Sequence, residues 1–243
     1  MPEFNYDIVT VDVEGSPMDV FLFSPAEEGP HPGIVLAQHI PVGHTGIEND
    51  TFTLTTAQRF ADNGYTVAVP FIFHWWPKTD SRDKKRDESR DDWMVLDIKA
   101  AFDLLCAYES VDADRVAMVG HCWGGRVAWL AGCHINRFKA LAVFYGGNIK
   151  KGLGEGSTPP IQLAGNISCP VIGFFGNEDG NPSPLDVNDY SAALSEANIS
   201  HEFYQYDGAG HAFQNFPLPE RYHEDASEDA WEKVIAFLNK QLA

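Results

Sequence analysis

The segment Arg115-Val116-Ala117-Met118-Val119-Gly120-His121-Cys122-Trp123-Gly124-Gly125 joins an apolar run to a glycine-flanked cysteine. A continuous apolar run is typical of a strand that is buried on both faces, as in a parallel sheet. The sequence Gly-x-Cys-x-Gly-Gly after it predicts a sharp turn into a helix at about 123–133. The glycines remove Cβ atoms that would clash in such a turn, so we expect the side chain of Cys122 to project above the sheet.

Apolar strands and helical stretches alternate along the rest of the chain. Strands are predicted at 33–37, 65–70, 140–145, 171–175 and 201–206, and helices at about 52–63, 92–109, 185–197 and 226–241. Residues 6–13 and 17–23 predict an N-terminal hairpin, whereas 78–92 and 146–160 predict irregular, solvated segments. This alternation favours an α/β fold with a mostly parallel central sheet flanked by helices on both faces.

The composition fits one soluble domain over residues 1–243, because 44% of the residues are hydrophobic and 21% are charged. The start of the chain lacks the features of a signal peptide, and no apolar run is long enough to span a bilayer, so we expect a cytoplasmic protein without a membrane partner. Thirty-five acidic residues against seventeen basic ones give a net charge of −18, which repels phosphate backbones and disfavours nucleic acid as a partner. Both a monomer and a homodimer are compatible with this composition.

Only one of the four cysteines lies in a context that suggests chemistry. Cys106 and Cys133 lie in apolar helical stretches, and Cys169 lies at a strand entrance, so we expect them to be structural. The cysteines form no C-x-x-C pair and no zinc-ligand spacing, and His39, His44 and His74 match no metal-binding motif. We therefore expect no metal, and Cys122 becomes the candidate nucleophile.

Two further residues with catalytic chemistry follow predicted strands downstream of Cys122. Asp179 comes just after the strand at 171–175, and His211 lies in a glycine-flanked loop after the strand at 201–206. Because the carboxyl ends of parallel strands meet at one edge of a sheet, we expect the three side chains to converge there. A histidine base oriented by a carboxylate would activate the thiol. An exposed loop histidine, a turn-forming Asp-Gly and the adjacent Glu178 are the alternatives.

The backbone N–H of Trp123, at the start of the helix after Cys122, is predicted to face a developing oxyanion. The same helix end favours a thiolate over a thiol.

These motifs resemble the dienelactone hydrolase (carboxymethylenebutenolidase) family of the α/β-hydrolase superfamily. The resemblance rests on Gly-x-Cys-x-Gly-Gly at 120–125, Gly-x-x-Asp at 176–179, Gly-x-x-His at 208–211 and the Tyr145-Gly146 pair. It implies a Cys122–His211–Asp179 triad that hydrolyses a small-molecule ester or lactone through an acyl-enzyme, without a cofactor. It also implies an oxyanion hole built from the N–H groups of Trp123 and Ile40.

The chain departs from that family after the strand at 33–37. The dienelactone enzymes of the family carry a glutamate there that helps to deprotonate the thiol, and His39 stands in its place here. A neutral imidazole can accept the thiol proton and an imidazolium can stabilise a thiolate, so we hypothesise that His39 contacts Cys122.

An aromatic patch follows the strand at 65–70 and reaches the same edge of the predicted sheet. His74, Trp75 and Trp76 either line the site, which predicts an apolar or aromatic substrate, or pack locally or in an interface. Three other functions remain open alternatives to ester hydrolysis. They are thioester or peptide hydrolysis on the same triad, acyl transfer to an acceptor other than water, and a non-catalytic relative with a redox-sensitive Cys122.

Overall fold

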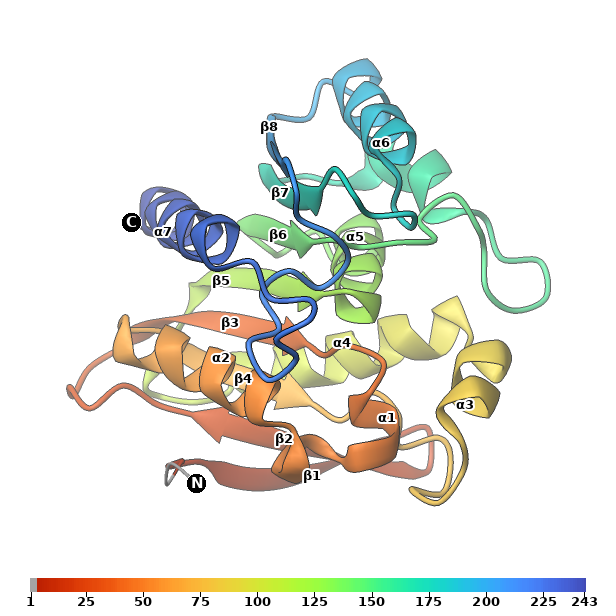
Figure 1. Ribbon diagram of the computed structural model, residues 1–243. Helices are drawn as coiled ribbons and strands as arrows, with labels where there is room; N and C mark the ends of the chain where they lie inside the picture. The colour runs from red at the N-terminus through yellow and green to blue at the C-terminus, as the bar shows by residue number, and fades with distance from the viewer. Residues whose placement is uncertain (1–3) are drawn as a thin grey trace.

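The computed structural model describes residues 4–243, so residues 1–3 of the predicted domain lie outside the described residues. The chain forms an eight-stranded sheet in the order β1-β2-β4-β3-β5-β6-β7-β8 (Figure 1). β3 to β8 run parallel, and β2 pairs antiparallel with both β1 and β4. The predicted α/β fold with a mostly parallel sheet and an N-terminal hairpin is therefore confirmed.

The strands are β1 (Asp7–Val13), β2 (Ser16–Phe23), β3 (His31–Ala37), β4 (Thr66–Pro70), β5 (Val111–His121), β6 (Ala140–Phe144), β7 (Val171–Gly176) and β8 (His201–Tyr206). The helices are α1 (Val42–Thr45), η1 (Ile47–Asn49), α2 (Thr51–Asp62), α3 (Arg82–Glu88), α4 (Asp91–Cys106), α5 (Trp123–His134), η2 (Pro160–Asn166), α6 (Pro184–Glu196) and α7 (Glu224–Gln241).

The helices cover the two faces of the sheet unequally. α2 and α7 pack on one face, and α4, α5 and α6 pack on the other (Figure 1). The central strands β4, β6 and β7 are buried along their whole length, because both of their faces lie under helices. Asp50 is the N-cap residue of α2. Its carboxylate accepts from the backbone N–H of Thr53 and so caps the first turn.

The charged segment after β4 is more ordered than the sequence predicts. Instead of a solvated loop it contains α3, and Lys85 on this helix has no exposed surface. The Lys85 ammonium donates to the carbonyl oxygens of Gly43 and Lys78. These tertiary contacts order the segment, and the pattern of charges along the sequence does not predict them. Ser81 caps the helix by accepting from the backbone N–H of Lys84 at 3.2 Å.

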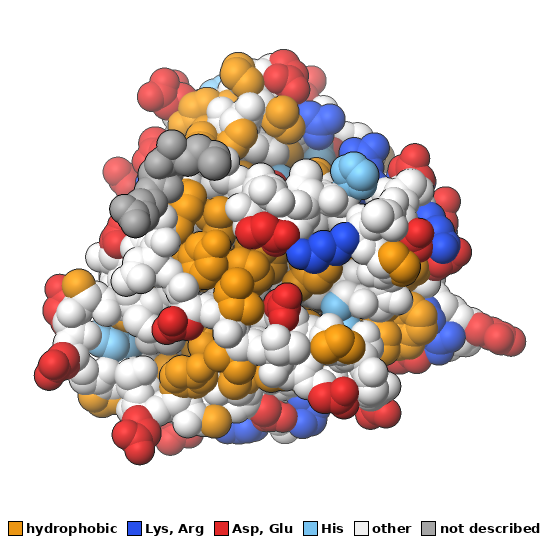
Figure 2. All heavy atoms as spheres, turned by 90° about the horizontal axis from the view of Figure 1, so that it is seen from below, with side chains coloured by type: hydrophobic (Ala, Val, Ile, Leu, Met, Phe, Trp, Pro, Cys, Tyr) orange, Lys and Arg blue, Asp and Glu red, His pale blue; other side chains and the backbone are white. Residues whose placement is uncertain are grey.

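Acidic side chains are scattered over the side of the molecule that faces downward in Figure 1. In this view Asp and Glu side chains lie around the outline, and apolar side chains are visible near the centre (Figure 2). Ile8 on the edge strand β1 is 52% exposed. Within residues 4–243, no helix combines the length and apolarity needed to span a membrane.

Candidate active site

The turn between β5 and α5 holds Cys122 in a strained backbone conformation, with φ 56° and ψ −113°. The neighbouring glycines allow this turn because backbone atoms approach them closely. A Cβ on Gly120 would lie 1.9 Å from the carbonyl oxygen of Gly124, and a Cβ on Gly124 would lie 2.1 Å from that of Ala37. Strand pairing of Ala37 with Gly120 brings these segments together. The turn therefore fixes the position of Cys122 at the carboxyl end of β5.

The structure brings the three predicted residues together at this edge of the sheet. Nε2 of His211 lies 3.0 Å from Sγ of Cys122, and Nδ1 of His211 lies 2.7 Å from Oδ2 of Asp179. The thiol and the imidazole are both partly accessible, whereas the Asp179 side chain is only 3% exposed. A thiol, an imidazole and a carboxylate are thus linked by hydrogen bonds in the order that nucleophilic catalysis requires.

Asp179, and not its neighbour Glu178, carries the carboxylate that reaches His211. Glu178 is exposed, and Asp179 is buried. The second oxygen of Asp179, Oδ1, accepts from the backbone N–H of Asn181 at 2.8 Å. Two hydrogen bonds, one to each carboxylate oxygen, therefore fix the orientation of Asp179 before any substrate binds.

His211 is arranged to carry a positive charge. Burial acts to lower its pKa, but the hydrogen bonds to Asp179 and Cys122 and the negative charges on both residues outweigh burial and raise the pKa to about 10. A charged imidazole at neutral pH stabilises a neighbouring thiolate and can later donate its proton to a leaving group.

The two predicted oxyanion donors keep their N–H groups free. Within residues 4–243, neither the backbone N–H of Trp123 nor that of Ile40 donates a hydrogen bond to a turn, loop or cap. Trp123 is the first residue of α5, so its N–H has no acceptor within the helix and lies at the positive end of the helix dipole.

The Tyr145 ring contacts the His211 ring. Its ring meets the His211 ring edge to face, with centroids 5.4 Å apart, and the backbone φ of Tyr145 is 40°. The side chain is buried, and its hydroxyl has no partner among the described residues. Burial raises the pKa of Tyr145, and the charges on Cys122 and Asp179 raise it further. The hydroxyl therefore stays protonated and can act only as a neutral group.

The His39 ring is held by a carboxylate other than that of Asp179. Its Nε2 lies 2.9 Å from Oδ1 of Asp50, and within residues 4–243 His39 makes no hydrogen bond to Cys122. Asp50 also caps α2, so His39 ties the segment after β3 to that helix. The N-cap position before Thr51 is the sequence signal that could have identified Asp50 as a partner.

His74, Trp75 and Trp76 are anchored to side chains of α3 and α4. His74 Nε2 and Trp75 Nε1 both bond to the buried carboxylate of Asp97 on α4, and the Trp75 ring stacks on Trp93 at 4.8 Å. Trp76 Nε1 donates to Glu88 at 2.9 Å. These contacts hold the three side chains against neighbouring helices, and a role of the patch in lining the site stays a prediction. Asp97 lies in the middle of an apolar helix, where no sequence motif marks it.

Within residues 4–243, no group of three or more His, Cys, Asp or Glu side chains is arranged to hold a metal ion. Catalysis without a cofactor stays a prediction. Cys133 and Cys169 are buried and Cys106 is half-buried.

Known proteins resemble this chain over nearly its whole length. The model of the "Dienelactone hydrolase family" matches residues 18–242. A "Putative carboxymethylenebutenolidase" of Yersinia pestis is 26% identical over 242 residues, which cover 93% of this chain and 85% of the relative. A protein of the same name from Synechocystis is 25% identical and covers 97% of this chain and 96% of its own length.

Solved structures share the same architecture. A "Putative Dienelactone Hydrolase" from Klebsiella pneumoniae superposes with a TM-score of 0.85 at 24% identity, covering 98% of this chain and 99% of its own. The dienelactone hydrolase-like promiscuous phosphotriesterase P91, from metagenomic libraries, superposes with a TM-score of 0.83 at 18% identity, covering 99% of both chains. These likenesses show the fold, and the family model covers the chain from within β2 to the end of α7. The chain therefore belongs to the dienelactone hydrolase family.

Proposed function

We propose that this protein hydrolyses carboxylic esters or lactones with Cys122 as the nucleophile. The observation that carries the proposal is the pair of contacts made by His211, at 3.0 Å to the thiol and 2.7 Å to Asp179. Acyl transfer needs a nucleophile, a base and an orienting carboxylate in this order. Membership of the dienelactone hydrolase family supports an ester or lactone as the substrate class.

In the proposed reaction, the thiolate of Cys122 attacks the carbonyl carbon of the substrate. The carbonyl oxygen becomes an oxyanion, which the backbone N–H groups of Trp123 and Ile40 stabilise. When the tetrahedral intermediate collapses, the bond from carbon to the leaving oxygen breaks, and the His211 imidazolium donates its proton to the alkoxide. The product of this half-reaction is a thioester between the acyl group and Sγ.

Water completes the cycle. The neutral His211 now accepts a proton from a water molecule, and the hydroxide attacks the thioester carbonyl. Collapse of the second intermediate releases the carboxylic acid and returns the thiolate of Cys122 facing the imidazolium of His211. Asp179 holds the imidazole in one orientation throughout and stabilises its charge.

An acyl-enzyme that forms on Cys122 tests the proposal directly. With a p-nitrophenyl ester, we expect a burst of one p-nitrophenol per active site and an intact mass increased by one acyl group. Cys122→Ala and His211→Gln should each lower kcat by at least about a thousandfold. Cys106→Ala is the matched control, because that thiol is half-buried and outside the triad. Full activity of Cys122→Ala would refute the proposal.

Further acyl donors and acceptors separate this reaction from its alternatives. Faster turnover of thioesters or peptides than of esters and lactones would redirect the assignment to those substrates. Hydroxylamine that captures the acyl group more efficiently than water does would indicate an acyltransferase. An unchanged mass after incubation with every acyl donor, together with oxidation of Cys122 by peroxide, would favour a redox-sensitive thiol.

A further inference from the structure

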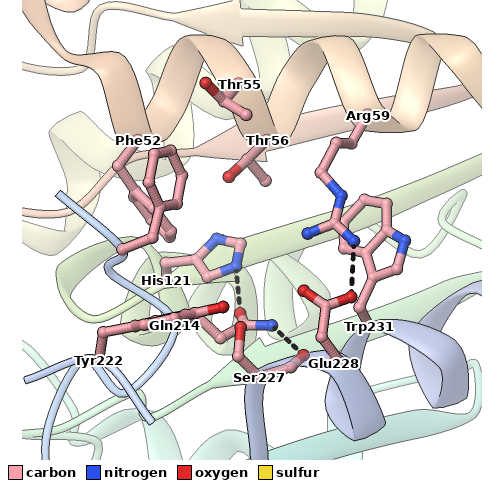
Figure 3. A pocket seen from close by; sticks show the side chains of 11 residues that line it. Phe52, Thr55, Thr56, Arg59, His121, Gln214, Tyr222, Ser227, Glu228 and Trp231 are labelled. Carbon is pink, nitrogen blue, oxygen red and sulfur yellow. Dashed lines mark hydrogen bonds and ion pairs between the residues drawn. The ribbon is translucent and has the colours of Figure 1, made fainter. Parts of the chain in front are cut away.

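A cavity of about 250 Å³ lies between α2 and α7, next to the segment that follows His211 (Figure 3). Side chains of α2 form one wall and side chains of α7 form the opposite wall, with His121 and Gln214 between them. Cys122, Asp179 and His211 do not line this cavity. Its volume suits a single small ring, because an engineered cavity of about 150 Å³ already binds benzene.

Two hydrogen bonds determine where the proton of His121 lies. The amide nitrogen of Gln214 donates to the carbonyl oxygen of Ser227 at 3.4 Å, so the amide oxygen of Gln214 faces His121. Nε2 of His121 lies 3.1 Å from that oxygen and must be the donor (Figure 3). Burial, with a smaller contribution from His39, lowers the pKa of His121 to about 3, and the ring is neutral at neutral pH. Nδ1 therefore keeps its lone pair.

This Nδ1 is an acceptor without a partner. Within residues 4–243 it receives no hydrogen bond, and in Figure 3 it faces the space between the two helices, toward Thr56. The His121 residue is only 4% exposed, and it lines the cavity. An unmet acceptor in such a place favours a ligand that brings a hydroxyl donor.

The rest of the lining favours a flat, uncharged molecule. Phe52 meets the His121 ring edge to face, with centroids 5.2 Å apart, and Trp231 lines the other end of the cavity (Figure 3). Arg59 stacks over Trp231 at 4.1 Å and pairs with Glu228 at 3.1 Å, so the one cation and the one anion of the lining neutralise each other. The lining therefore offers no unpaired charge to a charged ligand.

We infer that this cavity is a second binding site, which takes a small uncharged aromatic alcohol. The ring of the ligand lies between Phe52 and Trp231, and its hydroxyl donates to Nδ1 of His121. This inference is independent of the proposed ester hydrolysis, because binding involves neither the thiol nor its base.

Calorimetric titration of the full chain with phenol, toluene and benzoate tests the inference. Phenol and toluene have nearly the same shape, but only phenol has a hydroxyl. We expect phenol to bind about fivefold more tightly than toluene, as one net hydrogen bond provides. Benzoate should bind more weakly than phenol because its charge competes with the Arg59–Glu228 pair. Equal binding of phenol and toluene, or no binding of phenol, would overturn the inference.

Two variants locate the binding. His121→Phe removes the acceptor, so phenol and toluene should bind to this variant about equally tightly. Thr55 is a half-buried residue of α2 that lines the cavity, so Thr55→Trp fills the cavity and leaves His121 in place. This variant should bind both ligands more weakly. Gln58→Trp is the matched control on the same helix, because Gln58 does not line the cavity. Unchanged phenol binding by Thr55→Trp would place the ligand elsewhere and refute this site.

Discussion

Acid should destabilise this protein through His121, the residue that precedes the candidate nucleophile. The folded protein holds this ring neutral, because burial lowers its pKa from 6.5 to about 3. In the unfolded chain the ring takes up a proton near its ordinary pKa. Between these two values the unfolded state binds the extra proton, so the free energy of unfolding rises with pH across this window and falls on acidification.

The size of the effect follows from the two pKa values. Each pH unit between about 6.5 and about 3 is worth roughly 1.4 kcal/mol. Acidification from pH 7.5 to pH 4.5 therefore removes roughly 2 to 3 kcal/mol through this single group. That loss is a substantial part of the 5–15 kcal/mol that roughly spans the stability of ordinary domains.

Urea unfolding at a series of pH values can isolate this contribution. His121→Phe keeps an aromatic ring against Phe144, on which His121 stacks at 4.4 Å, but it cannot titrate. The variant loses the hydrogen bond to Gln214 and should be less stable than the wild type at neutral pH. The difference between the two proteins should then shrink by roughly 2 to 3 kcal/mol as the pH falls to 4.5.

His44→Gln provides the control for this experiment, because His44 is an exposed histidine on α1. The difference between this variant and the wild type should stay constant with pH. If the wild type and His121→Phe instead showed parallel stability curves from pH 7.5 to 4.5, His121 would not be held neutral, and the assignment of its lone pair would be wrong.

Four more outcomes follow from the structure. Lys85→Met should lower kcat for ester hydrolysis about tenfold with little change in KM, because it releases the segment after Ile40, whereas the exposed Lys84→Met should not. The alkaline limb of kcat/KM should fall near pH 10, where His211 loses its proton. Gly124→Ala should yield no folded protein in circular dichroism, because its Cβ would lie 2.1 Å from a backbone oxygen. His39→Ala should lower the free energy of unfolding by about 1–2 kcal/mol in urea and leave kcat unchanged.

A specific result would contradict each of these four predictions. Equal kcat for the two lysine variants would show that the buried ammonium does not position the segment after β3. Activity that persists well above pH 10 would contradict an imidazolium as the proton donor. A folded Gly124→Ala protein would mean that α5 can move away from β3. A loss of kcat without a loss of stability in His39→Ala would show that the His39 ring takes part in catalysis.

The sequence was sufficient to predict the features that depend on local pattern and chain order. Apolar periodicity predicts the order of the strands along the chain and the turn at Cys122. The geometry of parallel strands then predicts that Asp179 and His211 converge. These features are predictable because each strand end carries its functional residue within a few positions.

The features that the sequence could not predict depend on contacts between distant segments. The carboxylate of Asp50 holds the His39 ring, a pairing that no hydrophobic periodicity reveals, and contact of His39 with Cys122 stays a prediction. The charge run after β4 was expected to be solvated, but Lys85 finds two backbone carbonyls and becomes buried. A buried polar side chain is placed by its partners, and neither hydrophobic periodicity nor charge spacing identifies such partners.

The backbone contacts around Cys122 also have a consequence for evolution. Gly120 and Gly124 cannot accept a side chain, so mutation is strongly constrained at both positions. The side chain of Cys122 is itself partly open to solvent, and a serine there would require no movement of the backbone. Selection can therefore exchange sulfur for oxygen at this position while the location of the side chain is inherited unchanged. New chemistries can arise on this scaffold through single substitutions at one fixed point.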